Sequence, residues 1–154
     1  MCSSDLVTGT TSDPTTYNNQ GTYTITWKFN DGNGNTSTAT QRVVVDDVTA
    51  PAVPSIATAT GECSVTVTAP TTTDNCKGTV TGTTSDSLSY NTQGSYTITW
   101  RFNDGNGNTS TATQLVVVDD VTAPAVPSIA TATGECSVTV TTPTTTDKIG
   151  RAHV

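Results

Sequence analysis

Apolar and polar residues alternate along several short stretches of the chain. In the clearest stretch, residues 96–102, Tyr, Ile, Trp and Phe alternate with Thr and Arg. A period of two places one set of side chains on each face of a β-strand. The same alternation occurs in residues 63–68 and, more weakly, in residues 79–84. The pattern therefore predicts a strand in each of these three ranges.

A turn signal follows the clearest strand. Residues 104–108 read Asp-Gly-Asn-Gly-Asn, a run of residues that tolerate positive φ. Residues 109–118 then return as the expected hairpin partner, although their three final valines leave the inward face undecided. Residues 51–57 contain two prolines, so we expect a short edge strand there. Short strands between turn signals, without helical periodicity, are typical of a β-sandwich.

The whole pattern occurs twice, with an offset of 73 residues. Trp27, for example, recurs as Trp100. Residues 7–74 and 80–147 are identical at 60 of 68 positions. Self-similarity at a fixed period marks an array of repeated units.

The boundary between repeats is predicted within the sequence Asp-Asp-Val-Thr-Ala-Pro, which occupies residues 46–51 and again 119–124. Each copy follows a run of valines and ends in a proline, as expected for a strand end followed by a linker. One complete repeat then spans 47–119. Residues 7–46 are the C-terminal part of a preceding repeat, and residues 120–147 are the N-terminal part of the next.

Both ends of the chain carry a different signal. Residues 2–6 and 149–152 can be encoded by one DNA element read in opposite orientations. This resembles the translated adapter of a sequencing library. We therefore interpret residues 1–6 and 148–154 as artefacts and exclude them from the prediction of the fold.

Composition agrees with an all-β chain and limits its function. Thr occurs at 38 positions and Val at 17, and both are β-branched residues that favour strands. The net charge of -7 argues against nucleic-acid binding, which needs a basic surface. The one histidine, His153, lies in the excluded C-terminus, so the repeats offer no Ser-His-Asp triad and no His-ligated zinc site. We predict that the segment is not an enzyme.

The order of residues along the complete repeat resembles that of a known family. It reads Asp-x-x-Ala-Pro, Cys63, Asp74-Asn75-Cys76, Tyr90, Gly94, Ile98-x-Trp100, Asp104-x-x-Gly107-Asn108, then Val118-x-Asp120. This resembles the hyalin repeat and its relatives in bacterial surface proteins. The resemblance implies an immunoglobulin-like β-sandwich in tandem repeats, on secreted or cell-surface proteins associated with cell adhesion.

Two cysteines fall within the complete repeat. Cys63 and Cys76 are 13 positions apart, a spacing unlike that of CxxC metal or redox motifs. We predict a disulfide between them, because disulfides are typical of small extracellular domains with limited cores. The alternative is a pair of reduced thiols, as in a cytosolic protein.

Paired aspartates mark each repeat junction. Asp46 and Asp47 precede one linker, and Asp119 and Asp120 precede the other. Adjacent like charges are unfavourable unless they are solvated or bound by a cation. These four residues are therefore the candidate calcium ligands, since calcium prefers oxygen donors. The alternative is a solvated acidic linker without any cofactor. The turn at residues 104–108 is not an EF-hand, because it lacks the Gly and Glu that such a loop requires.

The sequence favours a structural or adhesive role over a catalytic one. Tyr96, Trp100 and Phe102 are predicted to pack in a core, with a sugar-stacking surface as the alternative. We expect a non-catalytic stalk or spacer within a larger extracellular protein, whose first partners are neighbouring repeats of the same chain. The alternatives are an immunoglobulin-like module that binds a glycan or protein, and a spacer within an extracellular enzyme.

Overall fold

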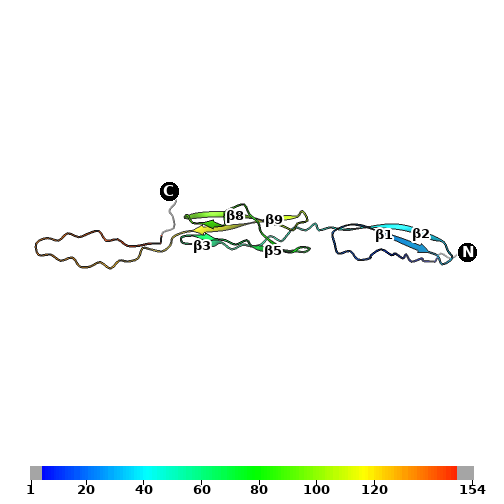
Figure 1. Ribbon diagram of the computed structural model, residues 1–154, viewed down its shortest axis with the longest axis horizontal. Helices are drawn as coiled ribbons and strands as arrows, with labels where there is room; N and C mark the ends of the chain where they lie inside the picture. The colour runs from blue at the N-terminus through cyan, green and yellow to red at the C-terminus, as the bar shows by residue number, and fades with distance from the viewer. Residues whose placement is uncertain (1–4, 149–154) are drawn as a thin grey trace. The chain divides into compact units, whose positions relative to one another are not determined.

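The computed structural model describes residues 5–148, and within that range it is built of β-strands without a helix (Figure 1). The strands are β1 (Gly21–Asn30), β2 (Thr36–Val45), β3 (Ala59–Gly61), β4 (Val65–Thr66), β5 (Thr71–Asp74), β6 (Gly78–Thr81), β7 (Ser89–Tyr90), β8 (Gly94–Asn103) and β9 (Thr109–Val118). They form four small sheets. The predicted all-β class is confirmed. The described part of the chain has no helix long and apolar enough to cross a membrane.

The chain divides into two compact units, Met1–Val48 and Thr49–Val154, with the boundary inside the 46–51 linker. The first unit is dominated by the antiparallel β1–β2 hairpin. Its ladder runs from the pair Gly21–Val45 to the pair Asn30–Thr36. One further strand-like contact comes from Thr10, which exchanges two backbone hydrogen bonds of 2.8 Å with Lys28.

The second unit contains the same hairpin with more strands around it. The ladder between β8 and β9 runs from Gly94–Val118 to Asn103–Thr109, which is the β1–β2 register shifted by one repeat. Strand β3 adds to β9 in parallel and gives a three-stranded sheet in the order β3-β9-β8. Two short antiparallel ladders, β4–β7 and β5–β6, complete the unit.

The core lies on one face of the β8–β9 hairpin. Ile98, Trp100 and Phe102 of β8 are at most 1% exposed, as the alternation predicted. The same period resolves the valine run of β9, because Val116 and Val118 are buried while Val117 is only half-buried. The core cluster also includes Val65, Val67, Val80 and Ala112. Burying these side chains is the main favourable contribution to folding of the unit.

Several strands differ from the sequence-based prediction. Residues 51–57 form no strand, and the parallel edge strand is β3, slightly later in the chain. Of residues 63–68, only β4 is a strand, although Val65 and Val67 do point inward as predicted. Strands β5 and β7 were not expected, because the threonine run of β5 and the two residues Ser89 and Tyr90 of β7 show no alternation of apolar and polar residues.

Residues 120–148 contain no strand. Val138 and Val140 correspond in sequence to Val65 and Val67, yet they are 53% and 71% exposed rather than 7% each. The hydrogen bond from Ala125 N to the Thr146 carbonyl repeats the one from Ala52 N to Thr73. This segment therefore keeps a local backbone contact of the complete repeat without its ladders or its core.

The predicted disulfide between Cys63 and Cys76 is absent from the described residues, where both cysteines are exposed. Cys63 follows β3, which pairs with the C-terminal end of β9. Cys76 lies in the β5–β6 turn, near the opposite end of the β8–β9 hairpin, because Asp74 at the end of β5 clusters with Asp104. Ten strand residues span about 33 Å, whereas the Cα atoms of a disulfide lie within about 7 Å. The repeat therefore separates the two cysteines that sequence spacing had paired.

Candidate metal site

Two aspartates of the second unit place their carboxylates together. Asp74 and Asp104 each offer one oxygen, and these oxygens lie within 4.8 Å of each other. Both side chains are buried, with 9% and 1% of their surface exposed. They come from two separate places in the sequence, the β5–β6 turn and the β8–β9 turn. Together they are the candidate metal site.

The β8–β9 turn fixes Asp104. Its Oδ1 accepts backbone hydrogen bonds from Asn106 at 2.7 Å and Asn108 at 3.1 Å, while Oδ2 accepts the Asn108 side-chain amide at 2.7 Å. Gly105 and Gly107 have φ of +89° and +108°, so the turn needs glycine at both positions. Burial by itself raises the pKa of Asp104, but these hydrogen bonds outweigh it and hold the pKa below its ordinary value. The carboxyl group is therefore kept ionised.

The β5–β6 turn fixes Asp74 in a similar way. Its Oδ1 accepts the backbone N–H groups of Cys76 at 2.9 Å and Lys77 at 2.8 Å. Its Oδ2 is buried and has no hydrogen-bond partner among the described residues. A buried carboxylate oxygen without a partner is unfavourable, so this atom needs an explanation.

The four aspartates predicted from the sequence have different surroundings. Asp47 is buried, whereas Asp46 and Asp119 are exposed and Asp120 is half-buried. Asp120 Oδ1 instead accepts the backbone N–H of Thr122 at 3.0 Å. Within residues 5–148, none of these three belongs to a group of metal-ligand side chains.

The sequence did not reveal that Asp74 and Asp104 lie together. The two residues are in different turns and far apart along the chain, so no local spacing connects them. One signal was available. Asp74 recurs as Asp147 and Asp104 corresponds to Asp31, so both fall at identical positions of the two copies.

The arrangement is suited to holding a cation. Calcium–oxygen distances are about 2.3–2.6 Å, so two oxygens on one calcium ion can lie up to about 5 Å apart. The separations in the cluster fall within that limit. The donors offered are carboxylate oxygens, which hard divalent cations prefer.

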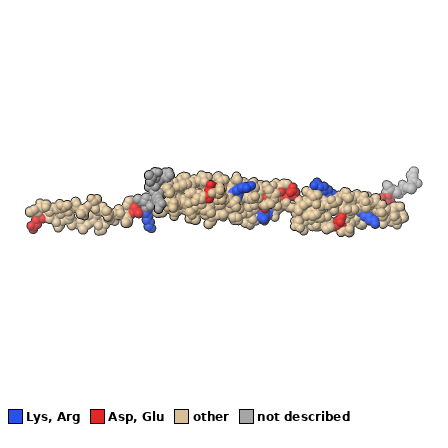
Figure 2. All heavy atoms as spheres, turned by 45° about the horizontal axis from the view of Figure 1, so that its top comes forward, with Lys and Arg blue, Asp and Glu red and all other residues tan. Residues whose placement is uncertain are grey.

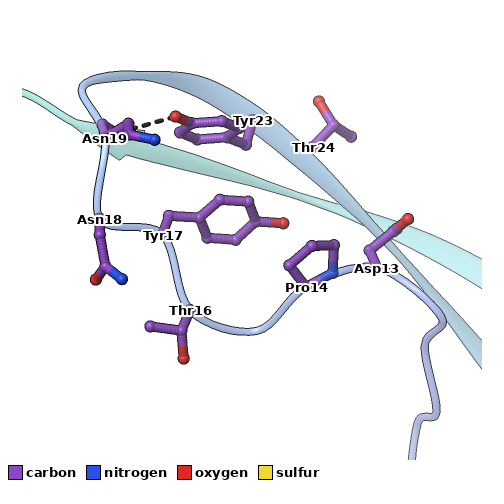
Figure 3. A pocket seen from close by; sticks show the side chains of 8 residues that line it. All are labelled: Asp13, Pro14, Thr16, Tyr17, Asn18, Asn19, Tyr23 and Thr24. Atoms are coloured by element: carbon purple, nitrogen blue, oxygen red, sulfur yellow. Dashed lines mark hydrogen bonds between the residues drawn. The ribbon is translucent and has the colours of Figure 1, made fainter.

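The first unit has an open hollow next to β1 (Figure 3). It is lined by the loop Asp13–Asn19 and by Tyr23, whose hydroxyl donates to the Asn19 carbonyl at 2.9 Å. Tyr17 stacks on Tyr23 with ring centroids 4.3 Å apart. The corresponding loop of the complete repeat pairs with β4, and the described residues of the first unit contain no counterpart of β4. The hollow is therefore the position that a strand occupies in the complete repeat.

Charged side chains do not gather into a basic patch on the face shown in Figure 2. Lys and Arg appear there singly, with Asp and Glu between them. This distribution agrees with the low charged fraction of the sequence, 12%. The face shown therefore has no surface of the kind that neutralises the phosphates of a nucleic acid.

Comparison with known proteins gives no family assignment. No protein-family model matches the chain, and no curated protein matches it.

Proposed function

We propose that the chain is a non-catalytic structural segment of a larger secreted or cell-surface protein. In this proposal the repeats are immunoglobulin-like sandwiches in tandem, and they act as a stalk or spacer. The observation that carries the proposal is the repetition itself, since 60 of 68 aligned positions are identical and the complete repeat buries its own core. Units of this kind lengthen a protein without requiring a catalytic site.

The pairing of β3 with β9 supports a mechanical role. These strands lie near the two ends of the complete repeat and run parallel, with Ala59, Thr60 and Gly61 opposite Val116, Val117 and Val118. A further bond joins Asp119 N to the Gly61 carbonyl at 3.0 Å. Tension on the two ends pulls parallel strands past each other, so these hydrogen bonds are loaded together. Shear of this kind resists extension better than opening the bonds one by one.

The sequence differences between repeats also favour a spacer over a binding module. Three of the eight differences, at Ser87, Leu88 and Ser89, lie in or beside β7. That strand is paired: Val67 N donates to the Leu88 carbonyl at 2.9 Å, and Thr66 lies opposite Ser89. The variable positions are thus engaged in the fold rather than offered as a free recognition loop.

Single-molecule force spectroscopy on the full chain tests the proposal. We expect one distinct unfolding peak, with a length gain of about 20 nm as residues 59–118 are released. Ala59→Pro should lower the peak force. Asp119 N donates to the Gly61 carbonyl, so in the alternating parallel ladder the N–H groups of Ala59 and Gly61 face β9, and proline at residue 59 removes one of these donors. Ala132→Pro is the matched control, since Ala132 is the counterpart of Ala59 in a segment without strands, and it should leave the force unchanged. A wild-type chain that extends without a force peak would contradict a load-bearing role.

A further inference from the structure

We propose that the first unit binds residues 120–147 of a second copy of this chain, so that one repeat is completed by two chains. Residues 7–46 correspond to residues 80–119 of the complete repeat, and residues 120–147 correspond to residues 47–74. Together the two parts supply nearly the whole repeat. This association goes beyond the spacer role, because it concerns contact between separate chains.

The first unit leaves one face of its hairpin partly uncovered. In the complete repeat, four core side chains of the hairpin are at most 1% exposed: Trp100, Phe102, Val116 and Val118. Their counterparts in β1 and β2 are of the same residue types but only half-buried: Trp27, Phe29, Val43 and Val45. The hairpin therefore keeps an apolar face, and burying it is favourable.

The segment 120–147 exposes the side chains that cover this face in the complete repeat. There, Val65 and Val67 belong to the core, and Ile56 packs against it. Their counterparts in the segment are largely exposed: Val138 at 53%, Val140 at 71% and Ile129 at 67%. Each part thus exposes apolar side chains that meet in the complete repeat.

The edge of β2 offers backbone hydrogen bonds to the same segment. In the complete repeat, β3 adds in parallel to β9, with Ala59–Gly61 opposite Val116–Val118. Strand β2 is the counterpart of β9, and among the described strands it pairs with β1 alone. An unpaired strand edge is a template for a further strand. Residues 132–134, the counterparts of β3, form no strand in the second unit and are available to add there.

The hollow beside β1 is the place for the next strand of the segment (Figure 3). In the complete repeat, β4 pairs with β7, which puts Val65 opposite Tyr90. Tyr17, the counterpart of Tyr90, already stacks on Tyr23 with ring centroids 4.3 Å apart. The Tyr90–Tyr96 pair has nearly the same separation, 4.5 Å. The receiving loop is therefore preformed, which lowers the entropic cost of binding.

The sequence differences between the copies leave this fit intact. None of the eight falls in the core cluster. Only one lies in the segment, where Thr142 stands at the position of the exposed Ala69. Pro14 replaces Ser87, which precedes the β4–β7 ladder and is not one of its paired residues.

The geometry of the complete repeat favours a second copy over closure within one chain. Ala52 N donates to the Thr73 carbonyl of β5, and β5 ends beside Asp104 at the turn of the β8–β9 hairpin. Asp119 directly follows β9, at the opposite end of the hairpin. The chain thus enters and leaves this repeat at ends about 33 Å apart. Closure within one chain would require the short linker 46–51 to reverse direction, whereas a second copy requires no such bend.

Sedimentation velocity of the full chain over a range of concentrations tests the association. The contact is head-to-tail, so each bound copy still offers one receiving unit and one segment to further copies. The mean mass should rise with concentration from 15.8 kDa through multiples of that value. A mass that stays at 15.8 kDa up to millimolar concentration would overturn the proposal.

The variant Val140→Asp tests the segment without disturbing a folded core. Val140 is 71% exposed in a stretch without strands, so the second unit should stay folded, which circular dichroism checks. In the association Val140 takes the buried position of Val67, and an unpaired charge there should weaken binding at least about 10-fold. Thr141→Asp is the matched control, because it adds the same charge at the counterpart of the exposed Thr68. Equal losses in the two variants would contradict the assigned contact.

A pair of engineered cysteines identifies the surfaces that meet. Thr66 and Ser89 lie opposite each other in the complete repeat, with hydroxyl oxygens 3.3 Å apart, and their counterparts are Thr139 and Thr16. We place Thr16→Cys and Thr139→Cys in separate chains whose native cysteines are replaced by serine. Mixed under mild oxidation, the two chains should form a disulfide-linked dimer that contains one of each.

Thr38→Cys in place of Thr16→Cys is the matched control. Its counterpart, Thr111, pairs with Arg101 toward the turn of the hairpin, away from the β4–β7 ladder. This control should give little mixed dimer. If the Thr38→Cys chain linked to the Thr139→Cys chain as readily as the Thr16→Cys chain does, or if no mixed dimer formed at all, the segment would not occupy the position of β4.

Discussion

The same residue has different surroundings in the two copies of the repeat. Trp100 is 1% exposed and donates from Nε1 to Gln114 Oε1 at 3.0 Å, and Gln114 in turn donates to the Ala57 carbonyl at 3.1 Å. Trp27 makes the equivalent bond to Gln41 at 2.9 Å but remains half-buried. Local sequence therefore sets the rotamer and the hydrogen bond. The neighbouring strands set the burial.

This contrast predicts unequal effects of one substitution. Trp100→Ala should lower the free energy of unfolding of its unit by about 3–5 kcal/mol, because it empties a closely packed core and leaves Gln114 without its donor. Trp27→Ala should cost about 1 kcal/mol or less. Urea unfolding followed by circular dichroism measures both. Equal losses in the two variants would mean that the tryptophans are equally packed.

At the scale of the element, the sequence predicted the strands with amphipathic alternation. It missed the strands that form only because a neighbouring strand pairs with them. Strand β8 was predicted to within two residues, and β9 was predicted with its bounds. Strands β5 and β7 are made largely of Thr and Ser. Their ladders form because β6 and β4 lie beside them, and such long-range pairing has no signature in a run of threonines.

A close contact between two strands cannot be predicted from a sequence pattern either. Gly82 follows β6, and a Cβ atom built there would lie 2.9 Å from Cε1 of Phe102. Phe102 is fully buried and cannot swing away. Gly9 meets Phe29 at the same distance, but Phe29 is half-buried and has room to move. Glycine is thus required at residue 82 by packing.

Gly82→Ala should therefore destabilise the second unit by about 1–3 kcal/mol through overpacking. Gly9→Ala provides the matched comparison and should change the stability of the first unit by less. Thermal melts of the two variants would measure the difference. If the Gly82→Ala variant had unchanged stability, the contact between β6 and β8 would be looser than it is in the structure.

At the scale of the whole molecule, the repeat period predicted the hairpins in register but not the candidate site. Asp104 was interpreted as part of an ordinary turn, and nothing in the sequence brought Asp74 to it. Their proximity depends on β5 and β8 ending at the same end of the repeat, which is a property of the topology and not of any spacing.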